Sequence, residues 1–323
     1  MEWIDAISPW ILWTFVIAWG AIWGSFANVV IARVPWGKSV VYPASHCPQC
    51  ETPIRWYDNL PILSWLRLKG RCASCRAVIP RRYLLVEVAG LVASALAFLH
   101  AAGGLSLWRW SSSPLDVLVV WMALTYLLIA LVALTAIDLE HALLPHKITG
   151  FLAILGVIYA AIGPRGGDFR GFVPGQDLYG ALLGFAIAYG SMWAFAWVYR
   201  LITGRYGIGG GDFMLFGVLG AWFGWEALPI LLLAASIQGV LAAALASRFF
   251  PSLMQEVSSD AFWEEDHPAA SVEESAEADR ADAADEEGSA PGHLGIAFGP
   301  FLCLAAVEYL FFGGYYMRWF WGL

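Results

Sequence analysis

The chain has 323 residues, of which 59% are hydrophobic and only 14% are charged. Soluble domains carry about 25% charged residues, and the apolar residues here come in long runs, so an ordinary soluble protein is excluded and a polytopic membrane protein is indicated. The net charge of −8 comes from residues 251–292, which hold 13 Asp and Glu against one Arg. The rest of the chain is mildly basic, and we expect membrane lipids but no nucleic acid as partners.

Eight apolar runs predict an all-α membrane protein with about eight transmembrane helices. The fourth and sixth runs are short, and the sixth could be tilted or re-entrant. Many of the 18 Trp lie near the ends of runs, as in an interfacial belt. The runs lie near residues 9–31, 84–102, 115–137, 148–163, 177–199, 212–225, 227–249 and 295–316. Examples of the belt are Trp3, Trp10, Trp108, Trp110, Trp319 and Trp321.

The Lys and Arg bias predicts the orientation in the membrane. Residues 33–82 carry nine Lys and Arg against two acids, which predicts a cytoplasmic loop and an external N-terminus. Alternation then places three further segments on the cytoplasmic side. These are residues 138–147, 200–211 and 250–294.

The same pattern predicts five units along the chain. The acidic unit has few apolar residues and is expected to be a disordered, solvated insertion, with a partner-binding segment as the alternative. The units are a first transmembrane helix (1–32), a four-cysteine domain (33–82), a transmembrane core (83–250), the acidic loop (251–293) and a last transmembrane helix (294–323).

Four cysteines form two CxxC pairs, Cys47 with Cys50 and Cys72 with Cys75, and 21 residues separate the pairs. A CxxC turn lets two thiolates face one ion, so two turns complete the closed tetrahedron typical of structural zinc. The cytosol is reducing, so disulfides are not expected, and a small domain would gain folding free energy from a metal. The alternative is two redox or unliganded pairs. Cys303 is assigned to packing.

Two aspartates stand at the edges of apolar runs: Asp138 closes the third run and Asp212 opens the sixth. Ionisable groups at such positions are costly and are functional candidates by default. The predicted topology brings both to the cytoplasmic surface at one depth. Two adjoining carboxyls can share a proton, so that one activates water while the other polarises a carbonyl. The pattern indicates an intramembrane aspartyl protease, with carboxyl oxygens within about 7 Å of each other.

Structural interpretations of each aspartate stay open. Asp138 could be an interfacial residue paired with a nearby cation, and Asp212 could cap a helix N-terminus. The cations available to Asp138 are His141, His146 and Lys147. Glycines 207 and 209–211 would allow tight turns and close approach of an extended peptide.

Two other classes of protein compete with a protease. A transporter could use the aspartates as an ion relay, but it would place acids near the midplane and show repeated halves, and we find no repeat. A non-catalytic secretion scaffold could dock partners through the cysteine segment and the acidic loop. Glu87 and Glu308 stay unassigned, and the oligomeric state is not indicated.

Several motifs occur in a fixed order along nearly the whole chain. Residues 24–35 read GSFANVVIARVP, and residues 58–66, between the cysteine pairs, read DNLPILSWL. Taken together, the motifs resemble those of the bacterial type IV prepilin peptidases, also called prepilin leader peptidase/N-methyltransferases. The later motifs are Arg82, Tyr83 and Glu87, then Asp138 with Leu144 and Pro145, the GxGD string ending at Asp212, and the FGP string at 298–300.

The resemblance implies an enzyme of the bacterial inner membrane that removes the leader from type IV prepilins or pseudopilins at the cytoplasmic face, in pilus or type II secretion systems. It implies Asp138 and Asp212 as the catalytic pair. Many members also methylate the new N-terminal amine with S-adenosylmethionine, an activity tied to the four-cysteine loop. Asn28 and Arg33 are the first residues to test for that role, and fixing the first helix against the zinc loop is their alternative.

Three departures from the family pattern stand out. His146 follows Pro145 where an acid is common, and Met214 stands where a Lys is common. The acidic insertion 251–292 is longer than the usual connection. The first two could alter substrate choice or pH optimum, but neither removes an aspartate of the pair.

Overall fold

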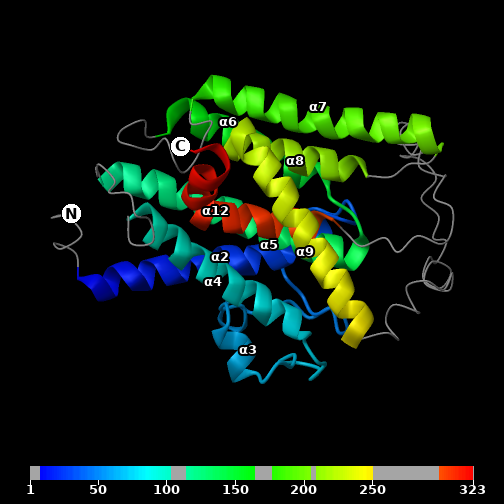
Figure 1. Cartoon of the computed structure of the whole chain (residues 1–323). Helices are drawn as coiled ribbons and strands as arrows, with labels where there is room; N and C mark the ends of the chain where they lie inside the picture. Colours follow the sequence, from blue (N-terminus) through cyan, green and yellow to red (C-terminus); the bar gives the residue numbers. More distant parts are fainter. Residues whose placement is uncertain (1–7, 103–113, 164–176, 205–208, 250–297, 323) are drawn as a thin grey trace.

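The structure is a computed structural model that describes residues 8–102, 114–163, 177–204, 209–249 and 298–322. Within these ranges the regular elements are helices, with two isolated bridges in the otherwise mostly irregular cysteine segment (Figure 1). The main helices are α2 (Pro9–Arg33), α4 (Arg81–Ala101), α5 (Pro114–His141), α6 (His146–Ile162), α7 (Leu178–Thr203), α8 (Gly210–Phe223), α9 (Leu228–Phe249) and α12 (Gly299–Trp321).

These helices coincide with the eight expected apolar runs, which confirms the all-α membrane fold. Six are long and apolar enough to cross a membrane. The other two, α6 and α8, are the runs that the sequence marks as short. The acidic segment 251–292 lies outside the described residues, as do Trp3, Trp108 and Trp110. Trp10 and Trp319, at the ends of α2 and α12, are highly exposed, as the predicted belt requires.

The helices pack as two groups joined through α12. In one group α2 and α5 flank α4, and in the other α6 and α7 pack on α8 (Figure 1). The last helix, α12, contacts α5 of the first group, α8 of the second, and α9. Asp138 lies in α5 of the first group and Asp212 in α8 of the second group. Because α12 contacts both helices, it lies at the junction between the two groups that carry these acids.

Glycines permit the tightest crossing in each group. An ideal Cβ on Gly20 of α2 would lie 2.5 Å from the carbonyl oxygen of Gly90 in α4. An ideal Cβ on Gly184 of α7 would lie 2.2 Å from the carbonyl oxygen of Gly220 in α8. In lipid, where apolar burial offers little driving force between helices, such close backbone contact is what holds helix pairs together.

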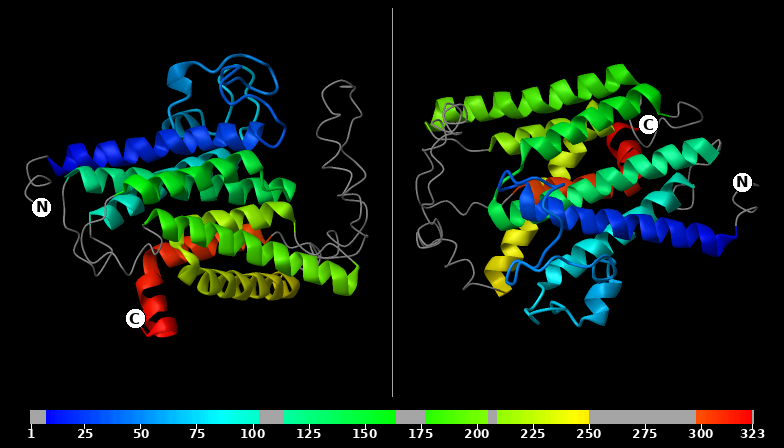
Figure 2. Two further views of the ribbon diagram at one scale, coloured as in Figure 1. Left: turned by 90° about the horizontal axis from the view of Figure 1, so that it is seen from above. Right: turned by 180° about the vertical axis from the view of Figure 1, so that it is seen from behind.

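The cysteine segment connects α2 to α4 and stands out from the bundle beside α2 (Figure 2). It contains a 3-10 turn, η1 (Trp56–Asp58), and one short helix, α3 (Leu63–Arg67). The two helices that carry it are antiparallel, since the Ser94 hydroxyl donates to the carbonyl of Val16 at 2.8 Å and the Asn28 amide donates to the carbonyl of Tyr83 at 2.9 Å.

Candidate active site and metal centre

Asp138 lies in the last turn of α5 and is only 6% exposed. Its Oδ2 atom is buried without a hydrogen-bond partner among the described residues. The structural interpretation paired it with a cation, but in the described part of the chain no His, Lys or Arg forms an ion pair with it; His141 instead faces Glu140, with 4.0 Å between Nε2 and Oε2. A buried carboxyl at a helix end without a cation partner among the described residues is a functional candidate.

Asp212 lies in the first turn of α8 and is partly buried. The alternative interpretation, a helix N-cap, is wrong: the N-cap is Gly209, which has no side-chain cap, and Asp212 stands three residues further on. Glycines occupy the N-cap and the first two positions of α8, and no side chain caps this helix. The Asp212 carboxyl therefore does not serve as the N-cap. Gly207 lies outside the described residues.

Leu144 joins three sequence-distant segments around these acids. An ideal Cβ on Gly211 would lie 2.7 Å from the Cβ of Leu144, so the GxGD string packs directly on the link between α5 and α6. An ideal Cβ on Gly299 would lie 3.1 Å from Cδ1 of the same leucine and 2.4 Å from Oδ2 of Asp138. The FGP and GxGD strings therefore meet at Asp138 and Leu144, although up to 161 positions separate them in the chain.

The Asp138 charge acts on Asp212, and the segments that carry the two acids meet at Leu144. The expected separation of about 7 Å between their carboxyl oxygens stays a prediction. Cys303 lies one turn after Gly299 in α12, and its thiol hydrogen bonds with the side chain of Thr135. Cys303 is buried, as packing predicts, and both aspartate charges act on its thiol. Sequence reasoning missed that location, because nothing local to Cys303 indicates which helix faces it.

The two family departures occupy different places. His146 is the first residue of α6 and is exposed. Met214, two residues after Asp212, packs against α6, where its Cε would lie 3.8 Å from a Cβ built on Gly150. The methionine thus fills an apolar helix contact.

Two contacts tie the cysteine segment to the helix end that carries Asp138. Arg82, at the start of α4, forms an ion pair with Glu140 of α5. Trp36, just after α2, makes an edge contact with the ring of His141, with 5.5 Å between ring centroids. The last turn of α5 is therefore held from the side of the cysteine segment, two and three residues after Asp138.

The two CxxC turns have one common geometry. In the first, the amide of Cys47 donates to the carbonyl of Thr52, and the amide of Glu51 donates back to the carbonyl of Cys47. In the second, Cys72 and Arg76 repeat both bonds at the same spacing, with Ala77 as the acceptor residue. Glu51 and Arg76 both have a positive φ, 53° and 64°. Such turns direct the first and fourth side chains of each motif to one side.

The four sulfurs form a candidate metal centre. The Sγ atoms of Cys47, Cys50, Cys72 and Cys75 all lie within 4.8 Å of one another. Zinc–thiolate bonds of about 2.3 Å in a tetrahedron give a sulfur–sulfur edge of about 3.8 Å. The Sγ atoms of Cys47 and Cys75, from different turns, are 3.8 Å apart. The donor set therefore fits a closed tetrahedral site, and the four cysteines are free thiols in the structure.

The surroundings of two cysteines favour the thiolate that a metal requires. Hydrogen bonding with the side chain and then the backbone of Thr52 lowers the pKa of Cys50 to about 6. Hydrogen bonds from the backbone of Cys75 and then Ser74 lower the pKa of Cys72. These neighbours come from within the turns themselves, so the metal-binding character is built locally.

Asn28 and Arg33, the two residues proposed for a methyl-donor site, have separate partners. Asn28 is buried between α2 and α4, where it bonds the Tyr83 carbonyl. Arg33 ends α2 and donates to the carbonyl of Ser39 at 3.1 Å. These contacts do not test a role in methyl transfer, so the assignment of Asn28 and Arg33 stays a prediction.

Comparison with known proteins extends over both helix groups. The profile of the bacterial peptidase A24 N-terminal domain matches residues 18–101, and that of the type IV leader peptidase family matches residues 124–244. The chain is 35% identical over 259 residues to a prepilin leader peptidase/N-methyltransferase of Aeromonas salmonicida, which covers 72% of this chain and 80% of the relative.

Two other relatives with the same name give similar figures. The protein from Neisseria gonorrhoeae is 36% identical over 69% of this chain and 78% of its own length. The protein from Klebsiella pneumoniae is 38% identical over 71% of this chain and 92% of its own length. No solved structure matches the chain. With both family profiles matched in order on a multi-pass helical fold, the chain belongs to the bacterial type IV leader peptidases, peptidase family A24.

Proposed function

We propose that this protein is a membrane-embedded aspartyl endopeptidase that removes the leader from type IV prepilins or pseudopilins, with Asp138 and Asp212 as the catalytic pair. The observation that supports this proposal is that the GxGD and FGP strings both pack on Leu144, with Gly299 also against the Asp138 carboxyl. The Asp138 charge also acts on Asp212. The relatives' name, prepilin leader peptidase/N-methyltransferase, supplies the substrate class.

In the proposed reaction the two carboxyls hold one proton between them. The ionised member takes a proton from a water molecule, which attacks the scissile carbonyl, and the protonated member donates a hydrogen bond to the carbonyl oxygen. The tetrahedral intermediate collapses when the leaving amine is protonated, which releases the leader and a new N-terminus. A metal is not needed in this step, because the carboxyls supply both acid and base.

The position of the acids favours a peptidase over an ion relay. Asp138 lies in the last turn of one helix and Asp212 in the first turn of another, which are both helix ends. A prepilin presents a basic leader outside the bilayer and an apolar helix within it, so its scissile bond falls at such a level. We place this end at the cytoplasmic face of the inner membrane, because residues 33–82 are rich in Lys and Arg.

The four cysteines would hold one structural zinc ion, since four thiolates leave no open position for chemistry. We further propose the five-unit division given by the sequence, with the zinc domain at 33–82. By analogy with the relatives' name we propose N-methylation of the product with S-adenosylmethionine as the methyl donor. Asn28 and Arg33 remain the first residues to test for that role, and each has a separate hydrogen-bond partner.

The test is cleavage of a synthetic prepilin by purified protein in detergent with S-adenosylmethionine present. Product masses report leader removal and any further methyl increment. Asp138→Asn and Asp212→Asn should each lower cleavage by about a thousandfold or more, because each removes an acid–base group. Asp177→Asn is the matched control, since that carboxylate only caps α7 through the amide of Gly180 at 2.8 Å. Full processing by either amide variant would exclude the aspartyl mechanism.

A further inference from the structure

A second polar cluster lies where α2 and α4 pack, and we name it the α2–α4 cluster: Ser25, Asn28, Ile62, Tyr83 and Glu87. The Glu87 carboxylate accepts a hydrogen bond from the backbone amide of Ile62 at 2.7 Å and another from the Ser25 hydroxyl. Asn28 is 3% exposed; its amide nitrogen bonds the Tyr83 carbonyl, while its Oδ1 has no partner among the described residues. The cluster brings together residues from three family motifs, none of which contains either aspartate. These motifs are residues 24–35, residues 58–66, and Arg82, Tyr83 and Glu87.

The loop that reaches Glu87 is strained and tightly built. Ile62 has φ 63° and ψ −51°, and the amide of Leu63 bonds the carbonyl of Pro61 at 2.6 Å, which makes a γ-turn of the rare type with positive φ. A β-branched residue in this region is costly, and such strain collects at functional sites. The structure imposes a conformation on Ile62 that its side chain disfavours, and the result is an amide directed at Glu87.

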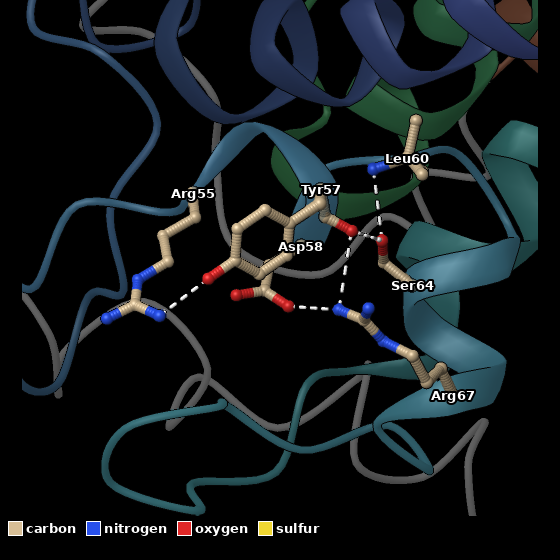
Figure 3. Close-up of polar contacts among 6 residues, drawn as sticks. All are labelled: Arg55, Tyr57, Asp58, Leu60, Ser64 and Arg67. Atoms are coloured by element: carbon tan, nitrogen blue, oxygen red, sulfur yellow. Dashed lines mark hydrogen bonds and ion pairs between the residues drawn. The ribbon is translucent and has the colours of Figure 1, made fainter.

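A hydrogen-bond network behind the loop fixes that conformation (Figure 3). The Ser64 hydroxyl donates to the carbonyl of Tyr57 and accepts from the amide of Leu60, both at 3.0 Å. Arg67 bonds the same Tyr57 carbonyl and forms an ion pair with Asp58. The segment that presents Ile62 is thus braced from both sides, independently of Glu87.

Glu87 has no ion-pair partner among the described residues, although cations are close in sequence. Arg82 pairs with Glu140, Arg67 pairs with Asp58, and Arg33 bonds the carbonyl of Ser39. Two neutral donors alone do not offset the cost of holding a carboxylate within an apolar helix pair. A partly buried acid between two apolar helices is a functional candidate, and a cation would offset its charge.

The cluster is close to the place where the proposed peptidase releases its product. Glu87 follows Arg82 by five residues, about 8 Å along α4, and Arg82 is ion-paired to Glu140, two residues after Asp138. Leader removal creates a primary ammonium group at the new N-terminus with every turnover. That group has three N–H donors and a positive charge, which match a carboxylate together with further oxygen acceptors.

We propose that the α2–α4 cluster binds the new N-terminal ammonium group of the processed pilin. This inference rests on the proposed function. Glu87 supplies the counter-charge, the Ser25 hydroxyl supplies a second acceptor, and Asn28 supplies an Oδ1 atom that has no partner in the described ranges. The site holds the amine that the relatives' second activity modifies, whatever residues hold the methyl donor.

The competing interpretation is that Glu87 only docks the cysteine segment on α4. Glu87→Gln separates the two, because the amide oxygen can still accept from the Ile62 amide and the Ser25 hydroxyl can bond either amide atom, while the charge is lost. Glu308→Gln is the matched control: Glu308 is a second carboxyl within the helices, accepts from Gln238 at 2.9 Å, and lies in α12, remote from the cluster in sequence.

The experiment uses full-length protein in nanodiscs without methyl donor. It measures binding of a peptide with the mature pilin N-terminus, labelled at its C-terminus, with the amine either free or acetylated. Wild-type protein and Glu308→Gln should prefer the free amine by about tenfold or more, the value of one charge-assisted contact. Glu87→Gln should lose this preference while prepilin cleavage and zinc content stay within about twofold. With donor added, the methyl increment on the product should fall in parallel.

Three results would overturn the inference: equal affinity of wild type for both peptides, an intact preference in Glu87→Gln, or joint loss of zinc and cleavage in that variant. Ser25→Ala gives a second test that leaves the Ile62 contact in place; it should reduce the preference severalfold, and an unchanged preference argues against the site. Failure of the peptidase proposal would show separately, as wild-type protein that does not cleave prepilin at all.

Discussion

Gly299 and Asp138 are in such close contact that the glycine has no room for a side chain. A Cβ at position 299 would lie 2.4 Å from Oδ2 and 3.2 Å from Cγ of Asp138. Because Gly299 begins α12, the first backbone amide of that helix interacts with the carboxyl. The FGP string therefore acts on the aspartate through its backbone, which explains why a residue without chemistry of its own stands there.

Gly299→Ala should reduce prepilin cleavage by about a hundredfold, the order of loss expected when a catalytic group moves by about 1 Å. The added methyl has to displace the Asp138 carboxyl or the α12 backbone. Measured kcat should fall more than KM rises, because the change displaces a proposed acid–base group and no residue proposed to bind the leader. Gly239→Ala in α9 is the control, since its Cβ would lie an ordinary 3.6 Å from the ring of Phe301, which belongs to α12 as Gly299 does. Equal activity of the two variants would mean that Asp138 tolerates displacement.

The close contact between Gly211 and Leu144 predicts that a second substitution, at Leu144, can restore activity lost by a substitution at Gly211. Gly211→Ala places a Cβ 2.7 Å from the Cβ of Leu144 and should impair cleavage by moving the GxGD turn. Adding Leu144→Gly removes the opposing Cβ and should restore part of the activity, whereas adding Leu144→Ala keeps that Cβ and should not. The measurement is the cleavage rate of the double variants relative to Gly211→Ala. Identical rates for both doubles would show that the contact does not limit activity.

The sequence predicted what local chemistry determines. Apolar length located the eight helices, the CxxC spacing located the sulfur cluster, and the cost of acids in a bilayer selected Asp138 and Asp212. It could not predict contacts set by helix packing, because the identity of the facing residue depends on rotation and crossing of distant helices. The place of Cys303 beside the acids, the bond from Ile62 to Glu87, and the fit of Leu144 between two glycines all belong to this second kind.

The Arg82–Glu140 ion pair joins the two regions matched by separate family profiles. Both side chains are about one-third exposed, so the pair should contribute no more than about 1 kcal/mol. Glu140→Arg should place two cations together and weaken docking of the α4 start on α5. The charge swap Arg82→Glu with Glu140→Arg should recover thermal stability and cleavage. A swap no better than the single variant would mean that the contact contributes nothing to the interface.

Loss of one thiolate should release the metal and loosen residues 33–82 without removing the aspartate pair. Cys47→Ser breaks the tetrahedron at its most buried ligand, and a small domain with little core depends on its metal to stay folded. Zinc content by mass spectrometry should fall, and limited proteolysis should cut between residues 33 and 82 faster than in wild type. Prepilin cleavage should persist, because the acids lie in helices outside that segment. Ser74→Ala is the matched control, since only the Ser74 backbone bonds Cys72 and alanine retains it. Unchanged zinc and protease resistance in Cys47→Ser would show that the four sulfurs are not a metal site.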